Sequence, residues 1–292
     1  MVSPVFYIAD VFAEEKYAGN QLAVIRGLGS ASADKMQNIA REMHFSETTF
    51  VISEQERSGG YDVRIFTPEK ELPFAGHPTL GTAFIIRQEI IGRPVPMVKL
   101  NLKAGQIPVS FDESADLVWM KQLPAEFGAT VEPSVMADVI SLGAGDIDSR
   151  FPVQSVSTAV PAFIVPLMTL SALKRARINS ARYNALIDKS DAKGILIFCP
   201  EPHRPESNLS VRFFADYYGV PEDPATGSAN GCLAGYLAHY RYFGGSGIDI
   251  RVDQGYEIRR PSLLHLRADE LNDGIEIFVG GKVIVIARGE LV

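Results

Sequence analysis

Two short segments combine a glycine with polar side chains in a pattern suited to holding an anion. They are Gly76-His77-Pro78-Thr79 and Gly227-Ser228-Ala229-Asn230, and each precedes an apolar stretch. The first turn of a helix tolerates proline, and the apolar residues that follow fit a buried helix, so both segments are predicted helix starts. A helix start offers unpaired N–H groups and about half a positive charge, and glycine lets a ligand approach the backbone. Taken alone, each start is better explained as a tight strand-to-helix turn.

Both segments belong to a motif that occurs twice. Val63-Arg64-Ile65-Phe66 precedes the first helix start, and Val211-Arg212-Phe213-Phe214 lies 148 positions further on, before the second. The Pro-x-x-Gly segments that open the helices, at Pro73 and Pro224, are 151 positions apart. A repeat of this length indicates a duplicated fold rather than a solenoid. The matched recurrence therefore favours two helix starts that face a common ligand.

Three polar residues at these starts are candidates for contacting a substrate. His77 is able to donate to a substrate oxygen or to shuttle a proton, although a solvated histidine in a first helical turn is as good an explanation. Asp223 precedes the second start, where an aspartate commonly caps a helix, and capping is compatible with substrate contact. Ser228 has the same two explanations.

Glu47 is the candidate general acid/base. It lies in Ser46-Glu47-Thr48-Thr49-Phe50-Val51, between the end of a predicted helix and an apolar strand. A surface glutamate is the default explanation at such a position. Burial in a closed cleft would instead desolvate the carboxylate and make it a base suited to removing a proton from carbon.

The elements around these residues predict an α+β fold. Short strand-like runs dominate and do not alternate strictly with helices, which disfavours a doubly wound parallel sheet. Two long apolar helices are expected over 76–91 and 227–243, each buried nearly all round and wrapped by a curved, mainly antiparallel sheet. A shorter helix is expected from the N-cap Ser32 to about His44. Residues 121–133 are predicted to be a linker, and a short helix is predicted over 135–142.

The duplication predicts two pseudo-symmetric lobes. A chain of 292 residues is long enough for two domains of ordinary size. The predicted boundaries give an N-terminal lobe of residues 1–120 plus 280–292 and a C-terminal lobe of residues 121–279. The active site is expected in the cleft between them.

Composition excludes several other classes of protein. Apolar residues make up 46% of the chain and charged residues 22%, and the net charge of −7 comes without a basic patch, so no nucleic-acid partner is expected. The most apolar stretch, 159–173, is interrupted by prolines and is too short to span a membrane. The N-terminus lacks the basic region of a signal peptide, so a cytoplasmic protein is expected.

The cysteine and glycine patterns argue against metal and nucleotide sites. Cys199 and Cys232 are the only cysteines, and neither has a neighbour at metal-ligand spacing, so no metal is expected. Gly27-Leu28-Gly29 is similar to the start of a dinucleotide-binding loop, but Ser32 replaces the third glycine and no βαβ unit is evident. Binding of NAD is therefore not expected.

The sequence resembles the PhzF family of phenazine-biosynthesis-type isomerases, within the diaminopimelate-epimerase-like fold. The matching stretches span most of the chain, and the most specific are Gly76-His77-Pro78-Thr79 and Asp223-Pro224-Ala225-Thr226-Gly227-Ser228. The others are Asp10-Val11-Phe12, Gly19-Asn20, Ala23-Val24, Ser46-Glu47-Thr48, Phe66-Thr67-Pro68, Gln254-Gly255, Arg260-Pro261-Ser262 and Val279-Gly280-Gly281.

The resemblance implies a cofactor-independent isomerase, usually a homodimer, that acts on a small carboxylate-bearing metabolite. Glu47 is implied as the general acid/base, with His77 and Asp223 as further catalytic residues. The residues implied to line the substrate site are Asn20, Ser46, Gly76, Gly227 and Ser228. In the phenazine enzyme of this family a proton moves from one carbon of a dihydro-hydroxyanthranilate to another, and a single carboxylate is able to carry out both steps.

Some positions depart from the family pattern. The epimerase branch of the fold uses two cysteines at the helix starts, whereas this chain has Ala75 and Thr226 there, which excludes a two-thiol mechanism. Gln21 replaces a proline that is usual in the family, and Arg259 replaces a frequent glycine. We expect the first change to soften a turn and the second to alter the rim of the site.

Two other functions fit the same residues. A related enzyme would use this site for a different proton transfer, because a fold does not fix its substrate. A binding or interaction protein would have kept the fold and lost the reaction. The retention of Glu47, His77 and Asp223 together argues against that second alternative.

Overall fold

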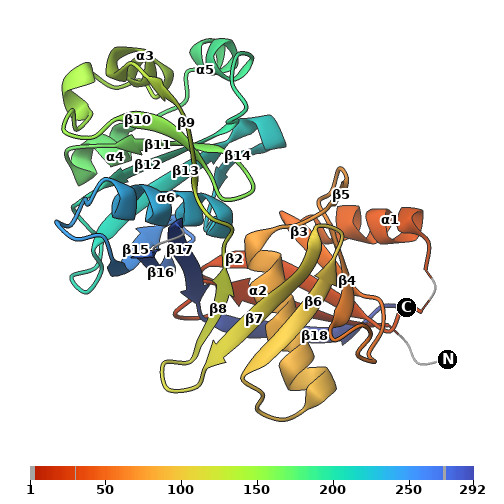
Figure 1. The fold of residues 1–292 in the computed structure, drawn as a ribbon. Helices are drawn as coiled ribbons and strands as arrows, with labels where there is room; N and C mark the ends of the chain where they lie inside the picture. The colour runs from red at the N-terminus through yellow and green to blue at the C-terminus, as the bar shows by residue number, and fades with distance from the viewer. Residues whose placement is uncertain (1–3, 30, 272–273) are drawn as a thin grey trace. The chain divides into compact units, whose positions relative to one another are not determined.

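The computed structural model describes residues 4–29, 31–271 and 274–292. The chain divides into two compact units (Figure 1). Unit 1 comprises Met1–Lys121 together with Gly280–Val292, and unit 2 comprises Gln122–Val279. The C-terminal segment therefore belongs to the same unit as the first strand.

Unit 1 is a sheet wrapped around one buried helix. Its strands are β1 (Val5–Val11), β2 (Asn20–Arg26), β3 (Glu47–Val51), β4 (Tyr61–Phe66), β5 (Glu71–Leu72), β6 (Met97–Leu102), β7 (Gly105–Asp112), β8 (Leu117–Lys121) and β18 (Val283–Glu290). They pair in the order β18-β1-β2-β3-β4-β6-β7-β8, with β2 parallel to β3, β4 parallel to β6 and the other neighbours antiparallel. The short β5 pairs with β4.

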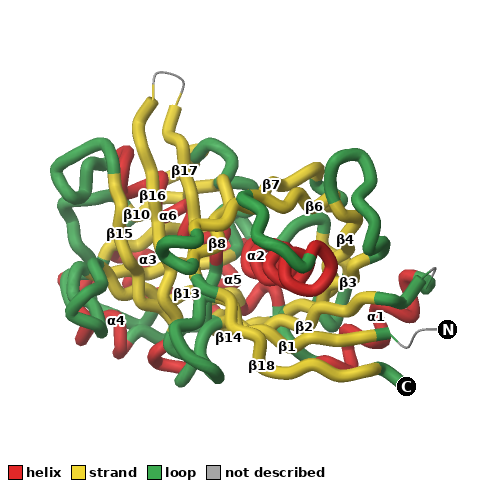
Figure 2. The backbone as a smooth tube through the Cα atoms, turned by 90° about the horizontal axis from the view of Figure 1, so that it is seen from below, coloured by secondary structure: helices red, strands yellow, loops and turns green. Residues whose placement is uncertain are grey.

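Helix α2 (Gly76–Ile85) lies inside this curved sheet, and Figure 2 shows it almost end-on with strands around it. Nine of its ten residues are buried, as its apolar sequence predicted. Gly81 permits the close packing, since a Cβ at this position would lie 2.5 Å from a methyl group of Leu22. The chain continues as a π-helical segment, η1 (Ile86–Ile91), which ends at Gly92 in the left-handed conformation. The predicted helix over 76–91 is thus two consecutive kinds of helix.

Helix α1 (Ala33–Met43) covers the outside of the unit 1 sheet at β3 and β4. Its caps are those that the sequence predicted: Ser32 accepts a hydrogen bond from the backbone of Lys35, and His44 ends the helix in the left-handed conformation. Because β2 and β3 are parallel, β2, α1 and β3 form a βαβ unit. The expectation that no such unit lies beside Gly27-Leu28-Gly29 is therefore wrong. Its signal was weak because β2 and β3 are short.

Unit 2 repeats the arrangement around helix α6 (Gly227–His239), of which eleven of thirteen residues are buried. Its strands are β9 (Glu126–Val131), β10 (Val153–Ser157), β11 (Ala162–Pro166), β12 (Gly194–Cys199), β13 (Leu209–Ala215), β14 (Val220–Asp223), β15 (Ile248–Gln254), β16 (Ser262–Leu271) and β17 (Gly274–Gly281), whose last two residues belong to unit 1. The pairing order β9-β10-β11-β12-β13-β15-β16 matches that of unit 1, including parallel pairs β11–β12 and β13–β15.

The remaining elements of unit 2 are short helices. They are α3 (Pro133–Val139), η2 (Ala144–Asp146), α4 (Leu170–Arg175), α5 (Ser180–Ile187), η3 (Asp216–Tyr218) and η4 (Tyr256–Ile258). The predicted linker over 121–133 is wrong, because it contains β9, which pairs with β10. The predicted helix over 135–142 corresponds to α3. The fold prediction is confirmed: the structure is α+β, with mainly antiparallel sheets and few helices.

The duplication extends to a pair of ion pairs. In unit 1 the guanidinium of Arg64 donates to both carboxylate oxygens of Glu71 at 2.8 Å. In unit 2 Arg212 donates to Glu222 in the same way, at 2.9 and 2.7 Å. Each arginine lies at the same place on its motif strand, β4 or β13, and each glutamate precedes its helix start. The repeated sequence motif therefore corresponds to a repeated local structure.

Candidate active site

Glu47 and His77 meet in unit 1. Glu47 is the first residue of β3 and His77 the second residue of α2, and Oε2 of the glutamate lies 3.4 Å from Nε2 of the imidazole. The side chains are 16% and 6% exposed, and both facing atoms are buried. The structure thus joins two of the predicted catalytic residues, which are thirty positions apart in sequence.

His77 is a neutral imidazole. Burial lowers its pKa from the usual 6.5 to about 3, and a hydrogen bond with the backbone of Gln21 acts in the opposite direction. A backbone group that favours the protonated ring is an acceptor, and Nε2 faces Glu47, so Nδ1–H donates to the Gln21 carbonyl. Nε2 then carries a lone pair. The 3.4 Å approach is a contact between a carboxyl group and a neutral base rather than an ion pair.

The local backbone explains how these side chains are held. Asn20 is the buried first residue of β2, and Gly19 before it has a positive φ of 69° and packs against the carbonyl of Val11. In the parallel register Leu22 faces Glu47, so Asn20 and Gln21 lie just before the start of β3. Ser46 precedes Glu47 and is half-buried, and Gly76 is the buried first residue of α2. The unit 1 residues of the predicted site therefore lie close to Glu47 or His77 in sequence or strand register: Asn20 in β2, Ser46 directly before β3 and Gly76 at the start of α2.

The other predicted site residues surround the start of α6 in unit 2. Asp223 ends β14, and one of its carboxylate oxygens accepts a short hydrogen bond from the hydroxyl of Thr226. Gly227 is the buried first residue of α6, and the half-buried Ser228 follows it. The carbonyl of Ser228 accepts from Thr158 at 3.4 Å. Asp223 is thus fixed by a side chain of the turn that leads into the helix.

Neither cysteine is suited to acid–base chemistry. Cys199 and Cys232 are buried, and burial raises the pKa of each thiol to about 11. A thiol is a nucleophile or base only as the thiolate, which is scarce near neutral pH at such a pKa. This agrees with the exclusion of a two-thiol mechanism.

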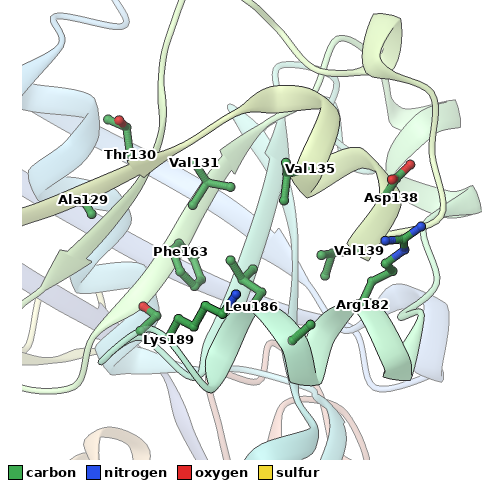
Figure 3. Close-up of a pocket in the computed structure, with 12 residues that line it drawn as sticks. Ala129, Thr130, Val131, Val135, Asp138, Val139, Phe163, Arg182, Leu186 and Lys189 are labelled. Atoms are coloured by element: carbon green, nitrogen blue, oxygen red, sulfur yellow. The ribbon is translucent and has the colours of Figure 1, made fainter.

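Two other features of unit 2 lack the geometry of a catalytic centre. A hollow of about 450 Å³ is lined by β9, α3 and α5, and Figure 3 shows its apolar floor at Phe163 and Leu186. None of the predicted site residues lines it. A Ser–His–Glu chain also occurs, with His203 Nδ1 2.8 Å from Ser210 and Nε2 3.2 Å from Glu257. Ser210 is 0% exposed, so its hydroxyl is inaccessible to a substrate.

Sequence reasoning missed Gln254, the most heavily bonded side chain at the α6 start. It is fully buried and contacts Asp223, Thr226 and Asn230. Gln254-Gly255 is among the stretches that match the family, but its sequence neighbours show no chemistry. Its partners lie 24 to 31 positions away, which local patterns do not reveal.

Comparison with known proteins identifies the family. The family model for phenazine biosynthesis-like proteins (PhzC-PhzF) matches residues 9–289. The chain belongs to this family. A trans-2,3-dihydro-3-hydroxyanthranilate isomerase from Pseudomonas aeruginosa is 33% identical over 97% of this chain and 98% of its own length. This PhzF-family chain is therefore an isomerase.

Solved structures agree with this assignment. A predicted epimerase from Pseudomonas aeruginosa is 33% identical and superposes with a TM-score of 0.81, with 99% of both chains covered. A PhzF-family protein from Bacillus anthracis has a TM-score of 0.91 over 100% of both chains at 24% identity, which supports the fold alone. The resemblance inferred from the motifs is confirmed.

The described residues contain neither a membrane-spanning helix nor a cluster of metal ligands. No helix in the described parts of the chain has the length and apolar character needed to cross a membrane. Within residues 4–29, 31–271 and 274–292, no three histidine, cysteine or acidic side chains are grouped so as to hold a metal ion.

Proposed function

We propose that this PhzF-family isomerase moves a proton between two carbons of a small, cyclic, carboxylate-bearing metabolite without a cofactor. Glu47 is the general acid/base, and His77 and Asp223 assist it. The substrate class is that of dihydroanthranilates, by analogy with the Pseudomonas aeruginosa relative named for trans-2,3-dihydro-3-hydroxyanthranilate. In this proposal Asn20, Ser46, Gly76, Gly227 and Ser228 bind the substrate, and the enzyme is a cytoplasmic homodimer.

The contact between Glu47 and His77 carries the proposal. The neutral imidazole places no positive charge beside the Glu47 carboxylate, so the two groups do not form an ion pair. Nε2 of His77 faces the carboxyl oxygen with a lone pair, and it is able to accept a hydrogen bond from the protonated acid. The pair therefore suits a group that takes up a proton, holds it and returns it.

The reaction then needs one carboxylate and two carbons. Glu47 removes a proton from a carbon next to an unsaturated system, where the negative charge is delocalised. The proton on the partly exposed carboxyl group exchanges with solvent, and the same carboxylic acid then protonates another carbon of the retained substrate. The unpaired N–H groups of a helix start hold the substrate carboxylate. A positioned base contributes about 10²- to 10⁴-fold, and fixed dipoles supply a further share of the rate.

Replacing Glu47 tests the proposal. In D₂O, with trans-2,3-dihydro-3-hydroxyanthranilate as the probe, we expect the wild type to give product that carries solvent deuterium. Glu47→Gln keeps the size of the side chain but removes the base, and its rate of deuterium incorporation should fall by about 10²-fold or more. Mass spectrometry of the product measures both rates.

Glu42→Gln is the matched control. Glu42 is an exposed residue of α1 in the same unit, and its replacement should leave incorporation unchanged. Incorporation by Glu47→Gln at the wild-type rate would remove Glu47 as the base. Turnover of the probe without any deuterium in the product would instead favour a different isomerisation.

A further inference from the structure

We propose that Gln254 is a positioning residue of the reaction: it orients the Thr226 hydroxyl, which in turn fixes the carboxylate of Asp223. This inference rests on the proposed function, because it assigns the support of Asp223 at the same site. Five hydrogen bonds within unit 2 carry it.

Gln254 is the last residue of β15 and is 0% exposed. Its Oε1 accepts from the backbone N–H of Thr226 at 3.3 Å and from Nδ2 of Asn230 at 2.8 Å. Its Nε2 donates to the backbone carbonyl of Asp223 at 2.8 Å and to Oγ1 of Thr226 at 3.2 Å. A backbone N–H only donates and a carbonyl only accepts, so these partners fix the orientation of the amide. One side chain thus joins both ends of the turn 223–226.

The direction of the Thr226 hydroxyl follows from the amide. Nε2–H of Gln254 points at Oγ1, so the hydroxyl oxygen accepts there and its own hydrogen is directed elsewhere. It points to Oδ2 of Asp223, with which Thr226 makes a short hydrogen bond. The relay Gln254–Thr226–Asp223 therefore selects one rotamer of the carboxylate.

The backbone around Gln254 is as constrained as its side chain. Gly255 has a positive φ of 79°, and a Cβ at this position would lie 2.6 Å from the carbonyl of Pro224 and 2.3 Å from that of Arg260. Only glycine permits this approach. The end of β15 is thus packed directly against the turn that carries Asp223.

The starts of α2 and α6 differ in whether a side chain is able to relay a hydrogen bond. Thr79 donates to the carbonyl of Ala75 at 2.7 Å in unit 1, and Asn230 donates to the carbonyl of Thr226 at 3.0 Å in unit 2. That bond is common to both copies. The residue at the position of Thr226 in unit 1 is Ala75, whose methyl group is unable to relay a hydrogen bond. The relay is therefore an addition to the repeat at the start that carries Asp223.

The consequence for catalysis is preorganisation. A carboxylate held in one rotamer meets the bound substrate without a search among conformers, and a misplacement of about 1 Å at a reacting centre costs on the order of 10²-fold in rate. Loss of the relay should therefore lower kcat more than it raises KM. A residue that only supported the fold would lower the amount of active protein instead.

Gln254→Glu removes the hydrogen-bond donor of the side-chain amide and keeps its acceptor. The new side chain has the same shape and keeps an acceptor for Thr226 N–H and Asn230, but its ionised carboxylate has no hydrogen to donate. With trans-2,3-dihydro-3-hydroxyanthranilate as the probe, we expect kcat to fall about 10- to 100-fold and KM to change less than about 3-fold. As the pH falls, the introduced carboxyl takes up a proton and donates again, so the ratio of variant to wild-type kcat should rise.

Gln154→Glu is the matched control. Gln154 is a buried glutamine of unit 2 that donates to the carbonyl of Gly128 at 2.9 Å and accepts from Tyr240, at the other end of α6. The Gln154→Glu variant also places a new carboxyl group in a buried position, and its kcat should stay within about 3-fold of the wild-type kcat at every pH. An equal loss in both variants would overturn the proposal, because burial of the charge would then explain it.

A double variant tests the relay. Thr226→Val removes the hydroxyl, so Gln254→Glu should lower kcat little further in that background. Additive losses would overturn the action through Thr226.

Amide hydrogen exchange over 223–230 needs no turnover, and we expect it to be about 10-fold faster in Gln254→Glu than in Gln154→Glu. A wild type that incorporates no deuterium would sink the proposed function. Faster exchange would then still support the anchoring of Asp223, and equal exchange would overturn it.

Discussion

His77 makes the stability of unit 1 depend on pH. Its folded-state pKa of about 3 lies below the usual 6.5, so between these values the unfolded chain binds a proton that the folded chain does not. The free energy of unfolding should therefore be highest above about pH 6.5 and should fall as the pH drops toward 3. Between pH 7 and pH 5 the free energy of unfolding should fall by about 2 kcal/mol. Urea titrations near pH 7 and pH 5 measure it.

Replacing the imidazole isolates this contribution. Asparagine retains an amide that is able to donate to the Gln21 carbonyl but does not titrate, so His77→Asn should lose about 2 kcal/mol less than the wild type between pH 7 and pH 5. His44→Asn, an exposed change at the end of α1, should keep the wild-type dependence. If His77→Asn and the wild type lose the same free energy of unfolding, His77 is not held neutral by burial.

The residues of the site were only partly predictable from sequence. Gly76, His77 and Asp223 stand in motifs whose spacing marks helix starts, and resemblance to the family added Glu47. The contact of Glu47 with His77 has no sequence signal, because it depends on how β3 packs against α2. The same holds for Gln254. Arg259 is at the C-cap of η4 with a φ of 61°, which explains why glycine is frequent at that position.

At the scale of elements, the two arginine–glutamate pairs provide an internal comparison. The side chain of Arg212 is 4% exposed and also donates to two carbonyls, of Leu173 and Ala176, at 2.9 Å, whereas Arg64 is 31% exposed. Removing one partner of a buried ion pair leaves the other charge buried without its counter-ion. Arg212→Met should therefore lower the free energy of unfolding by about 3 to 5 kcal/mol. Arg64→Met should cost about 1 kcal/mol, because water solvates the remaining Glu71.

Urea denaturation of both variants measures this difference, and Glu222→Gln in the Arg212→Met background serves as the check. It removes the stranded charge and should recover part of the lost stability. Equal costs for the two arginines would contradict the assignment of the larger burial penalty to unit 2.

The sequence predicted elements well where periodicity was strong. The apolar helices α2 and α6 and the capped α1 were found because their burial patterns and caps are local signals. Strand β9 was missed, since its exposed residues and the proline and glycine around it are typical of a linker. It is a strand because β10 offers a hydrogen-bonding edge, and that partner is distant in sequence.

At the scale of the whole molecule, each copy of the duplicated fold is completed by a strand from outside its own repeat. Strand β9 follows the last strand of the first copy and pairs with β10, the first strand of the second copy. Strand β18 follows the second copy and pairs with β1. The chain therefore does not divide into two foldable halves at a single point.

This topology predicts that residues 1–121 alone fold poorly. Without β18, β1 keeps β2 but loses its other antiparallel partner along its whole length, from Val5 to Val11. It then becomes an open, hydrophobic edge, which promotes aggregation. Fusing residues 280–292 to residue 121 through a short glycine–serine linker should restore a monomer with one cooperative thermal transition. The linker has little to span, because Gly280 packs against the ring of Trp119. Circular dichroism and size-exclusion chromatography measure both properties.

A fusion in which the order of residues 280–292 is scrambled loses the alternation that fits β1, so it should behave like residues 1–121. Cooperative unfolding of residues 1–121 without the added strand would show that β18 is dispensable.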